Sequence, residues 1–341
     1  MQSARPAAAP STAPRLFMPE EVAEVLAHYE LGTVTGVREL IGGGAGSPKA
    51  LVECARGRFV LKRRAPGRDN PFRVAFCHEV ILHLRAHGYP APELVGTRAE
   101  NNSLVQLDGR VYELFVFVDA RPFARHPAQA RSAGHRLSEL HARLAGFTPR
   151  HPEPPARPDP LATIRRAVDA LGTPYGGVAL ASVFTRASDA LRAPGDPPGP
   201  AGLVHGDWHP GNLLFAGDDV HTVFDFDGVH RAPLADDLAQ GLVQFSIVRS
   251  GDGPEDWPAE PDAELARALW DGYAAGPSAP RISPESAPFR MARSLAAEWG
   301  EGVVGGVLGG PETATRILGA AQRKAAWLVE HADTFAAALR G

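Results

Sequence analysis

The sequence is poor in cysteine and lysine and has no long apolar run. Cys54 and Cys77 are too few for a disulfide framework and lack the paired spacing of a zinc site. No apolar stretch approaches the length of a membrane span, and the opening MQSARPAAAPSTAPR lacks the apolar middle of a secretory signal. We therefore expect a protein of the reducing cytoplasm with no membrane partner.

A basic surface is also missing, since the formal net charge is −4. This balance argues against nucleic acid as a partner. The 341 residues exceed the size at which one core usually keeps growing, so two domains are expected. Lysine occurs three times, at Lys49, Lys62 and Lys324, in a chain that otherwise uses arginine.

The first part of the chain has the pattern of strands and the second that of helices. Short apolar segments at 37–41, 51–54 and 59–61 and a hairpin over 105–118 that turns at Asp108-Gly109 predict antiparallel strands. Helical spacing occurs at 19–29 and 72–87, and then at 128–144, 161–171, 178–191, 264–273, 288–299 and 311–339. We predict an α+β chain with a disordered tail (1–17), an antiparallel-sheet N-lobe (18–118) and a mainly helical C-lobe (119–341). The cleft between the lobes is the expected ligand site.

One segment has the spacing of a catalytic loop. His205, Asp207 and Asn212 in HGDWHPGN have the offsets of the kinase motif H-R-D-L-x-x-x-N. In that loop the aspartate orients the attacking hydroxyl and the asparagine binds magnesium. Apolar segments 213–215 and 220–224 predict a hairpin whose open end brings Asn212 and Asp225 about one strand spacing, ~4.8 Å, apart.

Two oxygen ligands there would suit magnesium, which fills its shell with water and phosphate oxygens. The alternative is that these residues only form turns, which Asp, Asn and Gly favour. The coincidence of four residue types with one hairpin favours the catalytic interpretation. His205 and Asp237 are expected to be structural, with Asp237 capping or bracing a helix beneath the loop. No G-x-S-x-G elbow supports a hydrolase.

Candidate nucleotide-binding residues lie in the N-lobe. Lys62 ends a strand and could contact phosphates, or it is a solvated strand end. Glu79 could pair with Lys62 from the helix 72–87, or it is an exposed acid. Glycines in the segment 41–47 (IGGGAGS), including Gly43 and Gly44 with Ser47, could let backbone amides approach phosphate. The backbone of strand 112–116, which contains Glu113 and Phe115, could bond adenine, or the strand is ordinary core.

These motifs resemble the aminoglycoside phosphotransferase and choline kinase superfamily, which carries H-G-D-x-x-x-x-N and then I/V-D-F/W. The resemblance covers about 39–239; it is specific in the catalytic loop and loose in the glycine loop. It implies a protein-kinase-like two-lobed fold, with ATP and Mg2+ as cofactors. It also implies roles for individual residues: Asp207 as catalytic base, Asn212 and Asp225 as metal ligands, Lys62 on the phosphates with Glu79 as partner, and 112–116 as hinge. Asp227 could be a further ligand, as in methylthioribose kinases.

The expected reaction is transfer of the γ-phosphoryl group to a hydroxyl of a small molecule: an amino sugar, an amino alcohol or a homoserine-like compound. Residues 236–301 hold twelve acids and five arginines, which would suit a cationic acceptor or form a solvated acidic surface. A compact bacterial Ser/Thr protein kinase and a non-catalytic nucleotide-binding regulator remain alternatives. Acceptor identity and oligomeric state are not determined by the sequence.

Overall fold

The computed structural model describes residues 17–40, 47–155, 157, 159–171, 177–192, 200–278, 282–304 and 310–341. The chain forms two compact units. The first comprises Met1–Asp69 and Leu94–Phe117, and the second Asn70–Glu93 and Val118–Gly341. The predicted tail lies outside the described residues except for Phe17, which is buried in the core of the first unit. The lobe division predicted at 118 and 119 stays a proposal.

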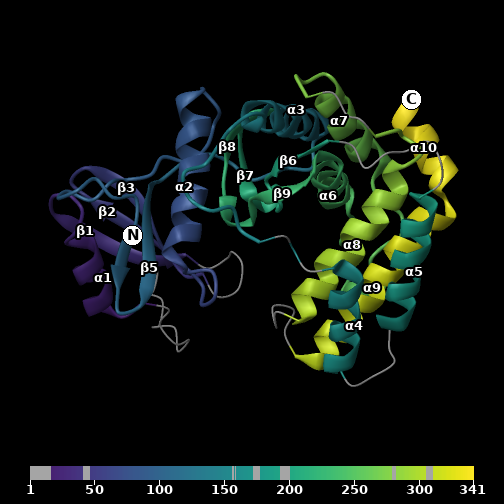
Figure 1. Ribbon diagram of the computed structural model, residues 1–341, viewed down its shortest axis with the longest axis horizontal. Coiled ribbons are helices and arrows are strands. Elements are labelled where there is room, and N and C mark those ends of the chain that lie inside the picture. The colour runs from purple at the N-terminus through teal and green to yellow at the C-terminus, as the bar shows by residue number, and fades with distance from the viewer. Residues whose placement is uncertain are drawn as a thin grey trace, which may run out of the picture. The chain divides into compact units, whose positions relative to one another are not determined.

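Five antiparallel strands make the sheet of the first unit, in the order β1-β2-β3-β5-β4 (Figure 1). They are β1 (Val34–Leu40), β2 (Lys49–Cys54), β3 (Gly57–Arg63), β4 (Val105–Leu107) and β5 (Arg110–Val116). Asp108 and Gly109 between β4 and β5 have φ values of 48° and 72°. Positive φ at both central residues is what a type I′ turn requires, so the hairpin predicted from Asp-Gly is confirmed.

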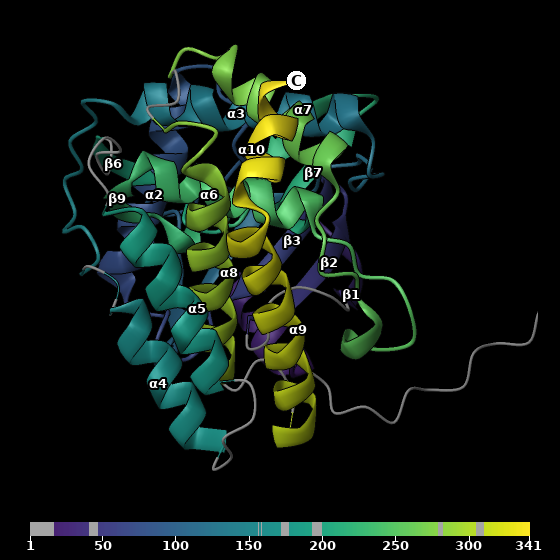
Figure 2. The same cartoon turned by 90° about the vertical axis from the view of Figure 1, so that its right-hand side faces the viewer.

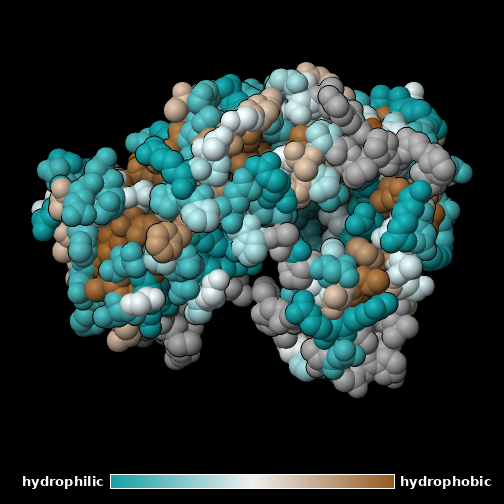
Figure 3. All heavy atoms as spheres, in the orientation of Figure 1, coloured by the Kyte–Doolittle hydropathy of each residue, from teal (hydrophilic) through white to brown (hydrophobic). Residues whose placement is uncertain are grey.

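The two faces of this sheet differ in character. On one face, alternate residues of β2, β3 and β5 form a buried apolar cluster with α1 (Pro19–Leu26). Because strand side chains alternate between faces, Lys49, Lys62 and Glu113, which pair in register, share the other face. Figure 3 shows hydrophobic side chains gathered over the middle of this unit with hydrophilic ones around them. The lysine predicted to be functional therefore lies outside the apolar core.

The second unit is mainly helical. Its first helix begins after Asn70, whose side chain accepts the N–H groups of Phe72 and Arg73, and Pro71 occupies the first position. Helix α8 packs against α4, α5, α6 and α9, and Figure 2 shows α4, α5, α8 and α9 running side by side. The helices are α2 (Pro71–Ala86), α3 (Pro127–Leu144), α4 (Pro160–Leu171), α5 (Gly177–Ala190), α6 (Leu234–Ser246), α7 (Ala263–Ala274), α8 (Ala287–Val304), α9 (Pro311–Glu330) and α10 (Ala332–Arg340).

Two small antiparallel sheets complete the second unit. One pairs β6 (Ala201–Val204) with β9 (His230–Pro233), and the other pairs β7 (Leu213–Ala216) with β8 (Asp219–Val223). Helices α3 and α7 approach closely because each has a glycine, which lacks a Cβ, where it contacts the other helix. A Cβ at Gly134 would collide with the Leu269 carbonyl oxygen, and one at Gly272 with that of Arg131.

The structure differs from the sequence-based expectation at a few elements. The β7–β8 hairpin is confirmed, and Asp237 lies in the first turn of a helix, α6, whose bounds were not predicted; β6 and β9 were not predicted. Four-residue strands such as β6 and β9 carry too little alternation to be recognised, and they become strands by pairing with each other. The helix predicted over 311–339 is two helices that break at His331.

Among the helices that the structure describes, none combines the length and apolarity needed to cross a membrane.

Candidate active site

The predicted catalytic loop, His205–Asn212, joins β6 to β7 in the second unit. Gly206 has a φ of 72°, and a Cβ there would collide with the carbonyl oxygen of Gly228. The backbone therefore needs glycine between His205 and Asp207.

Asp237, in the first turn of α6, holds this loop in place. Its carboxylate accepts the N–H groups of His205 (2.7 Å) and Gly206 (2.9 Å) and lies 3.0 Å from His141 Nε2. The other ring nitrogen of His141 is 2.7 Å from the Tyr273 hydroxyl. Burial is the largest influence and would raise the pKa of Asp237, but the His141 and backbone interactions outweigh it and lower that pKa. An ionised, fully buried carboxylate thus braces the loop.

His205 is a structural residue of the site. Its side chain is fully buried, and ring Nε2 lies 2.9 Å from the Phe224 carbonyl oxygen. The ring packs against Trp208 and Phe226, with centroids 5.3 Å and 5.0 Å away. It therefore links the loop to the segment that follows β8.

Asp207 is held by two neighbours in the loop. Asn212 Nδ2 donates to the Asp207 carbonyl oxygen (2.9 Å) and to its carboxylate (3.1 Å). His209 Nδ1 accepts the Gly211 N–H, and its Nε2 lies 3.6 Å from the Asp207 carboxylate. Burial would raise the pKa of Asp207, but the interaction with His209 outweighs it, so that pKa is lowered. Asp207 is accordingly an oriented, ionised group at neutral pH.

The β7–β8 hairpin brings Asp225 to this loop. Its last pair is Leu213 with Val223, and beyond it the Phe224 N–H donates to the Asn212 carbonyl oxygen (2.7 Å). Asp225 follows directly and has left-handed φ and ψ values of 58° and 63°. Its negative charge acts on Asp207, whose pKa it tends to raise. A non-glycine residue in this conformation is often found where function requires it.

Asp227 lies in the short 3-10 turn Phe226–Gly228 after Asp225. It is buried, and its carbonyl oxygen accepts from the Arg73 guanidinium (3.1 Å). In the described parts of the chain, no three His, Cys, Asp or Glu side chains are arranged to hold a metal ion. With Asn212 Nδ2 turned to Asp207, Oδ1 is the amide atom that could bind a cation. One amide and one or two carboxylate oxygens are a donor set that fits magnesium, completed by phosphate and water.

The candidate nucleotide residues lie in the first unit. Lys62 is buried on β3 opposite Glu113 on β5. The Glu113 carboxylate forms a buried ion pair with Arg64 (2.6 Å). Ser47 Oγ accepts the Ala65 N–H (3.2 Å).

Strand β5 is paired along both edges, with β3 on one side and with β4 and Leu94 on the other. The predicted adenine contact by this strand, which includes Glu113 and Phe115, stays a prediction. Gly43 and Gly44 lie outside the described residues.

Glu79 lies on α2 in the second unit. Its carboxylate accepts the N–H groups of Arg150 (2.8 Å) and His151 (3.1 Å). Burial would raise the pKa of Glu79, but these backbone bonds outweigh it and lower that pKa. Within its own unit, Glu79 therefore anchors the chain that follows α3. Its pairing with Lys62, a residue of the first unit, stays a prediction.

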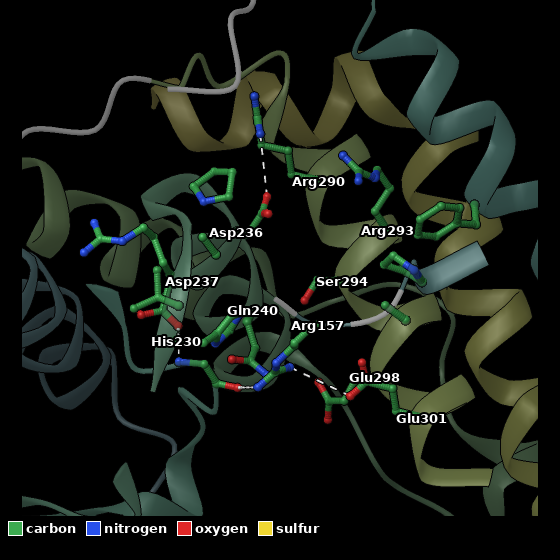
Figure 4. A pocket seen from close by; sticks show the side chains of 18 residues that line it. Arg157, His230, Asp236, Asp237, Gln240, Arg290, Arg293, Ser294, Glu298 and Glu301 are labelled. Carbon is green, nitrogen blue, oxygen red and sulfur yellow. Dashed lines mark hydrogen bonds and ion pairs between the residues drawn. The ribbon is translucent and has the colours of Figure 1, made fainter. Parts of the chain in front are cut away.

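A cavity of about 330 Å³ lies beside the catalytic loop within the second unit. Its wall includes Gly206, next to Asp207, and Gln240, whose Oε1 accepts the Trp208 N–H (2.9 Å). Figure 4 shows charged side chains of both signs around it, including Arg157, Asp236, Arg290, Arg293, Glu298 and Glu301.

Sequence reasoning did not identify several of these groups. His209, inside the motif, could have been found as a polar neighbour of Asp207. His141, Gln240, Arg293 and Glu298 carry no local signal, because they lie on helices with ordinary amphipathic spacing. Packing of those helices brings them to the loop or to the cavity beside it.

An oriented aspartate, an asparagine and a second aspartate at the end of one hairpin are the groups found at a kinase catalytic centre. The sequence model described as the phosphotransferase enzyme family matches residues 37–283. The match covers well over half of the chain, so the chain belongs to the phosphotransferase enzyme family and is an enzyme of that class.

The chain is also similar in sequence to homoserine kinases. A homoserine kinase of Rhodopseudomonas palustris (strain TIE-1) is 28% identical over 240 residues, which are 64% of this chain and 66% of that protein. A homoserine kinase of Caulobacter sp. (strain K31) is 26% identical over 85% of this chain and 89% of the relative.

Solved structures show the same fold. An amicoumacin kinase in complex with AMP-PNP, Ca2+ and Ami has a TM-score of 0.64 at 13% identity, covering 93% of this chain and 94% of that one. A microcompartment-associated aminopropanol kinase also has a TM-score of 0.64, at 17% identity over 92% of this chain and 98% of that one. The predicted α+β, protein-kinase-like fold is therefore confirmed.

Proposed function

We propose that this phosphotransferase moves the γ-phosphoryl group of ATP, with Mg2+, to a hydroxyl group of a small molecule. The observation that carries the proposal is the arrangement of Asp207, Asn212 and Asp225 at the open end of the β7–β8 hairpin. The structure of the amicoumacin kinase with AMP-PNP and Ca2+ supports a nucleotide and a divalent cation as the ligands.

Asp207 is the residue that would act on the acceptor. Its carboxylate is ionised and fixed by Asn212 and His209, so it can orient the acceptor hydroxyl and take its proton. The acceptor oxygen forms a bond to the γ-phosphorus while the bond from that phosphorus to the oxygen of ADP breaks. The proton passes to Asp207 and then to solvent. Positioning supplies most of the expected rate enhancement.

The residues proposed to hold the cofactors are those that the sequence predicts. Asn212 and Asp225, with Asp227 as a third candidate, would hold Mg2+, which neutralises phosphate charge when bound. The proposed nucleotide contacts are Lys62 with Glu79, then Gly43, Gly44 and Ser47 for the phosphates, and Glu113 and Phe115 for the base.

The acceptor classes proposed are amino sugars, amino alcohols and homoserine-like compounds. The named homoserine kinases and the solved aminopropanol kinase support an amino-bearing alcohol. The proposed location is the cytoplasm, as the low cysteine count of the sequence predicts.

A coupled ADP-release assay over these three classes tests the function. Asp207→Asn should lower kcat by roughly 10²- to 10⁴-fold, the range for loss of a general base, while nucleotide binding measured by calorimetry persists. Asp219→Asn is the matched control, because Asp219 is exposed at the opposite end of the same hairpin. Full activity of Asp207→Asn would contradict the assignment. Phosphate transfer to casein but to no small alcohol would contradict the acceptor class.

A further inference from the structure

The cavity beside the catalytic loop has one wall formed by a single face of α8. The lining residues of that helix, between Arg290 and Glu301, are spaced by three and four positions, so they share one side of the helix. The charges of these lining residues change from positive to negative along α8, with arginines near the start of the helix and glutamates near its end. Figure 4 shows the two groups at different parts of the cavity.

The lining charges are balanced and mostly paired. The cavity has four acids and four arginines, which gives no net charge to attract a polycation. Three of the acids and three of the arginines have an ion-pair partner; for Asp237 that partner is a histidine. The pairs are Asp236–Arg290, Glu301–Arg157, Arg231–Glu153 and Asp237–His141. Among the residues that the structure describes, Glu298 and Arg293 are thus the lining charges left without an ion-pair partner.

Glu298 lies at the end of the cavity near the reaction centre. Its carboxylate accepts two hydrogen bonds from the Gln244 amide (2.6 and 2.8 Å), which leaves lone pairs on both oxygens unused. Burial raises the pKa of Glu298, and the negative charge of Asp207 adds to that effect, although the Gln244 bonds and the charges of His209 and Arg249 oppose it. A desolvated carboxylate whose only hydrogen-bond partner is a neutral amide is costly, and an incoming ammonium group would relieve that cost.

Arg293 is the complementary group. Its guanidinium lies over the Phe184 ring, 5.3 Å from the centroid, and Nε is buried without a hydrogen-bond partner. Burial lowers the pKa of Arg293, and although the negative charge of Asp236 opposes this shift, the positive charge of Arg290 adds to it. The stacked, planar guanidinium keeps donors that match a carboxylate.

We propose that the acceptor carries both an ammonium and a carboxylate group, with Glu298 binding the ammonium and Arg293 the carboxylate. The inference rests on the proposed function and narrows it to hydroxyl-bearing amino acids. Five residues of helix separate the two side chains by about 7.5 Å of rise, a span that two long side chains can close on one small zwitterion. Gly206 and Gln240 bring the cavity next to the catalytic loop, and the interaction of Glu298 with Asp207 places the Glu298 end of the cavity beside the catalytic residue.

Matched substrate triples test the acceptor class. L-Homoserine is compared with 3-amino-1-propanol, which lacks the carboxylate, and with 4-hydroxybutanoate, which lacks the ammonium. The equivalent triples built on serine and 5-hydroxynorvaline vary the chain length. Within the best triple, kcat/KM for each truncated compound should be roughly 10- to 100-fold below that of the amino acid, the usual loss when one charged hydrogen-bond partner is missing.

Two variants test which side chain binds the ammonium group of the acceptor and which binds its carboxylate. Glu298→Gln should raise KM roughly 10- to 100-fold for the amino acid and the amino alcohol and leave the hydroxy acid within about twofold. Arg293→Gln should show the converse, with the losses on the amino acid and the hydroxy acid. KM for ATP should not change in either variant. A purely structural role would lower turnover of all three compounds alike.

The exposed pair Glu255 and Arg316 supplies the controls, because Glu255→Gln and Arg316→Gln make the same chemical changes away from the cavity. Amino alcohols or amino sugars turning over better than the matched amino acids would overturn the inference. Equal effects of both variants on all three compounds would do so as well. If no amino acid reacts while another alcohol releases ADP, the inference fails and the proposed function stands. If no alcohol reacts, the proposed function itself fails.

Discussion

Replacing Asp237 should both destabilise the protein and slow catalysis, because the catalytic loop loses the carboxylate that holds it. The Asp237 carboxylate accepts the N–H groups of His205 and Gly206 and contacts His141 Nε2. Asp237→Ala would leave these three buried donors without a partner. Each such donor costs about 1–3 kcal/mol, and removing one partner of a buried charged pair costs about 3–5 kcal/mol. Because the donors are not independent, we expect a loss of about 4 kcal/mol.

Urea denaturation followed by tryptophan fluorescence measures this loss, because Trp208 is a fully buried residue of the loop. Asp236→Ala is the matched control for stability. Its side chain is 48% exposed and lies 3.8 Å from the buried Arg290, so its loss should be smaller, about 1–2 kcal/mol. In the active fraction, kcat of Asp237→Ala should fall about 10²-fold, because a displacement of about 1 Å at the catalytic group has that effect. A destabilisation of Asp237→Ala no greater than that of Asp236→Ala would refute the bracing role.

The same variant has a defined pH dependence. The folded-state pKa of Asp237 is lowered, so its contribution to stability is present above the unfolded-state pKa, about 3.9. It is lost as the pH falls through the folded-state value. The difference in unfolding free energy between wild type and Asp237→Ala should therefore be constant from about pH 5 to 7 and shrink below about pH 4. A difference that grows in acid would contradict this sign.

Three further predictions concern packing and buried charge. Gly134→Ala should lower the free energy of unfolding by about 3 kcal/mol, because its Cβ meets the backbone of α7. Gly109→Ala has open space but a φ of 72°, so it should cost only about 1 kcal/mol. Equal losses of the two variants in urea denaturation would contradict the collision. Burial lowers the pKa of Lys324 to about 8, so the stability of wild type relative to Lys324→Met should rise between about pH 8 and pH 10, and a fall would refute the sign. Arg64→Met should cost about 3–5 kcal/mol because it removes one partner of a buried ion pair with Glu113, and a thermal scan with an unchanged midpoint would exclude that ion pair as a source of stability.

Local features of the fold could be read from the sequence because they depend on neighbouring residues. The turn at Asp108-Gly109 follows from two residues that tolerate positive φ. The β7–β8 hairpin follows from two apolar runs around Gly217, and it determines that Asn212 is hydrogen-bonded to Phe224, next to Asp225. A helix at Asp237 was expected, but the bounds of α6 were not predicted, because its amphipathic stretch follows directly on motif residues.

By itself the sequence determined the class of chemistry: the spacing of Asp207, Asn212 and Asp225 places these groups together through one loop and one hairpin. Tertiary structure decided which other groups face them. Glu298 and Arg293 lie far along the chain on α8, and no local rule predicts that these are the charges left unpaired in the cavity. The physical reason is that pairing of charges depends on how helices pack against one another, whereas turns and strand pairing across a short loop depend on adjacent residues.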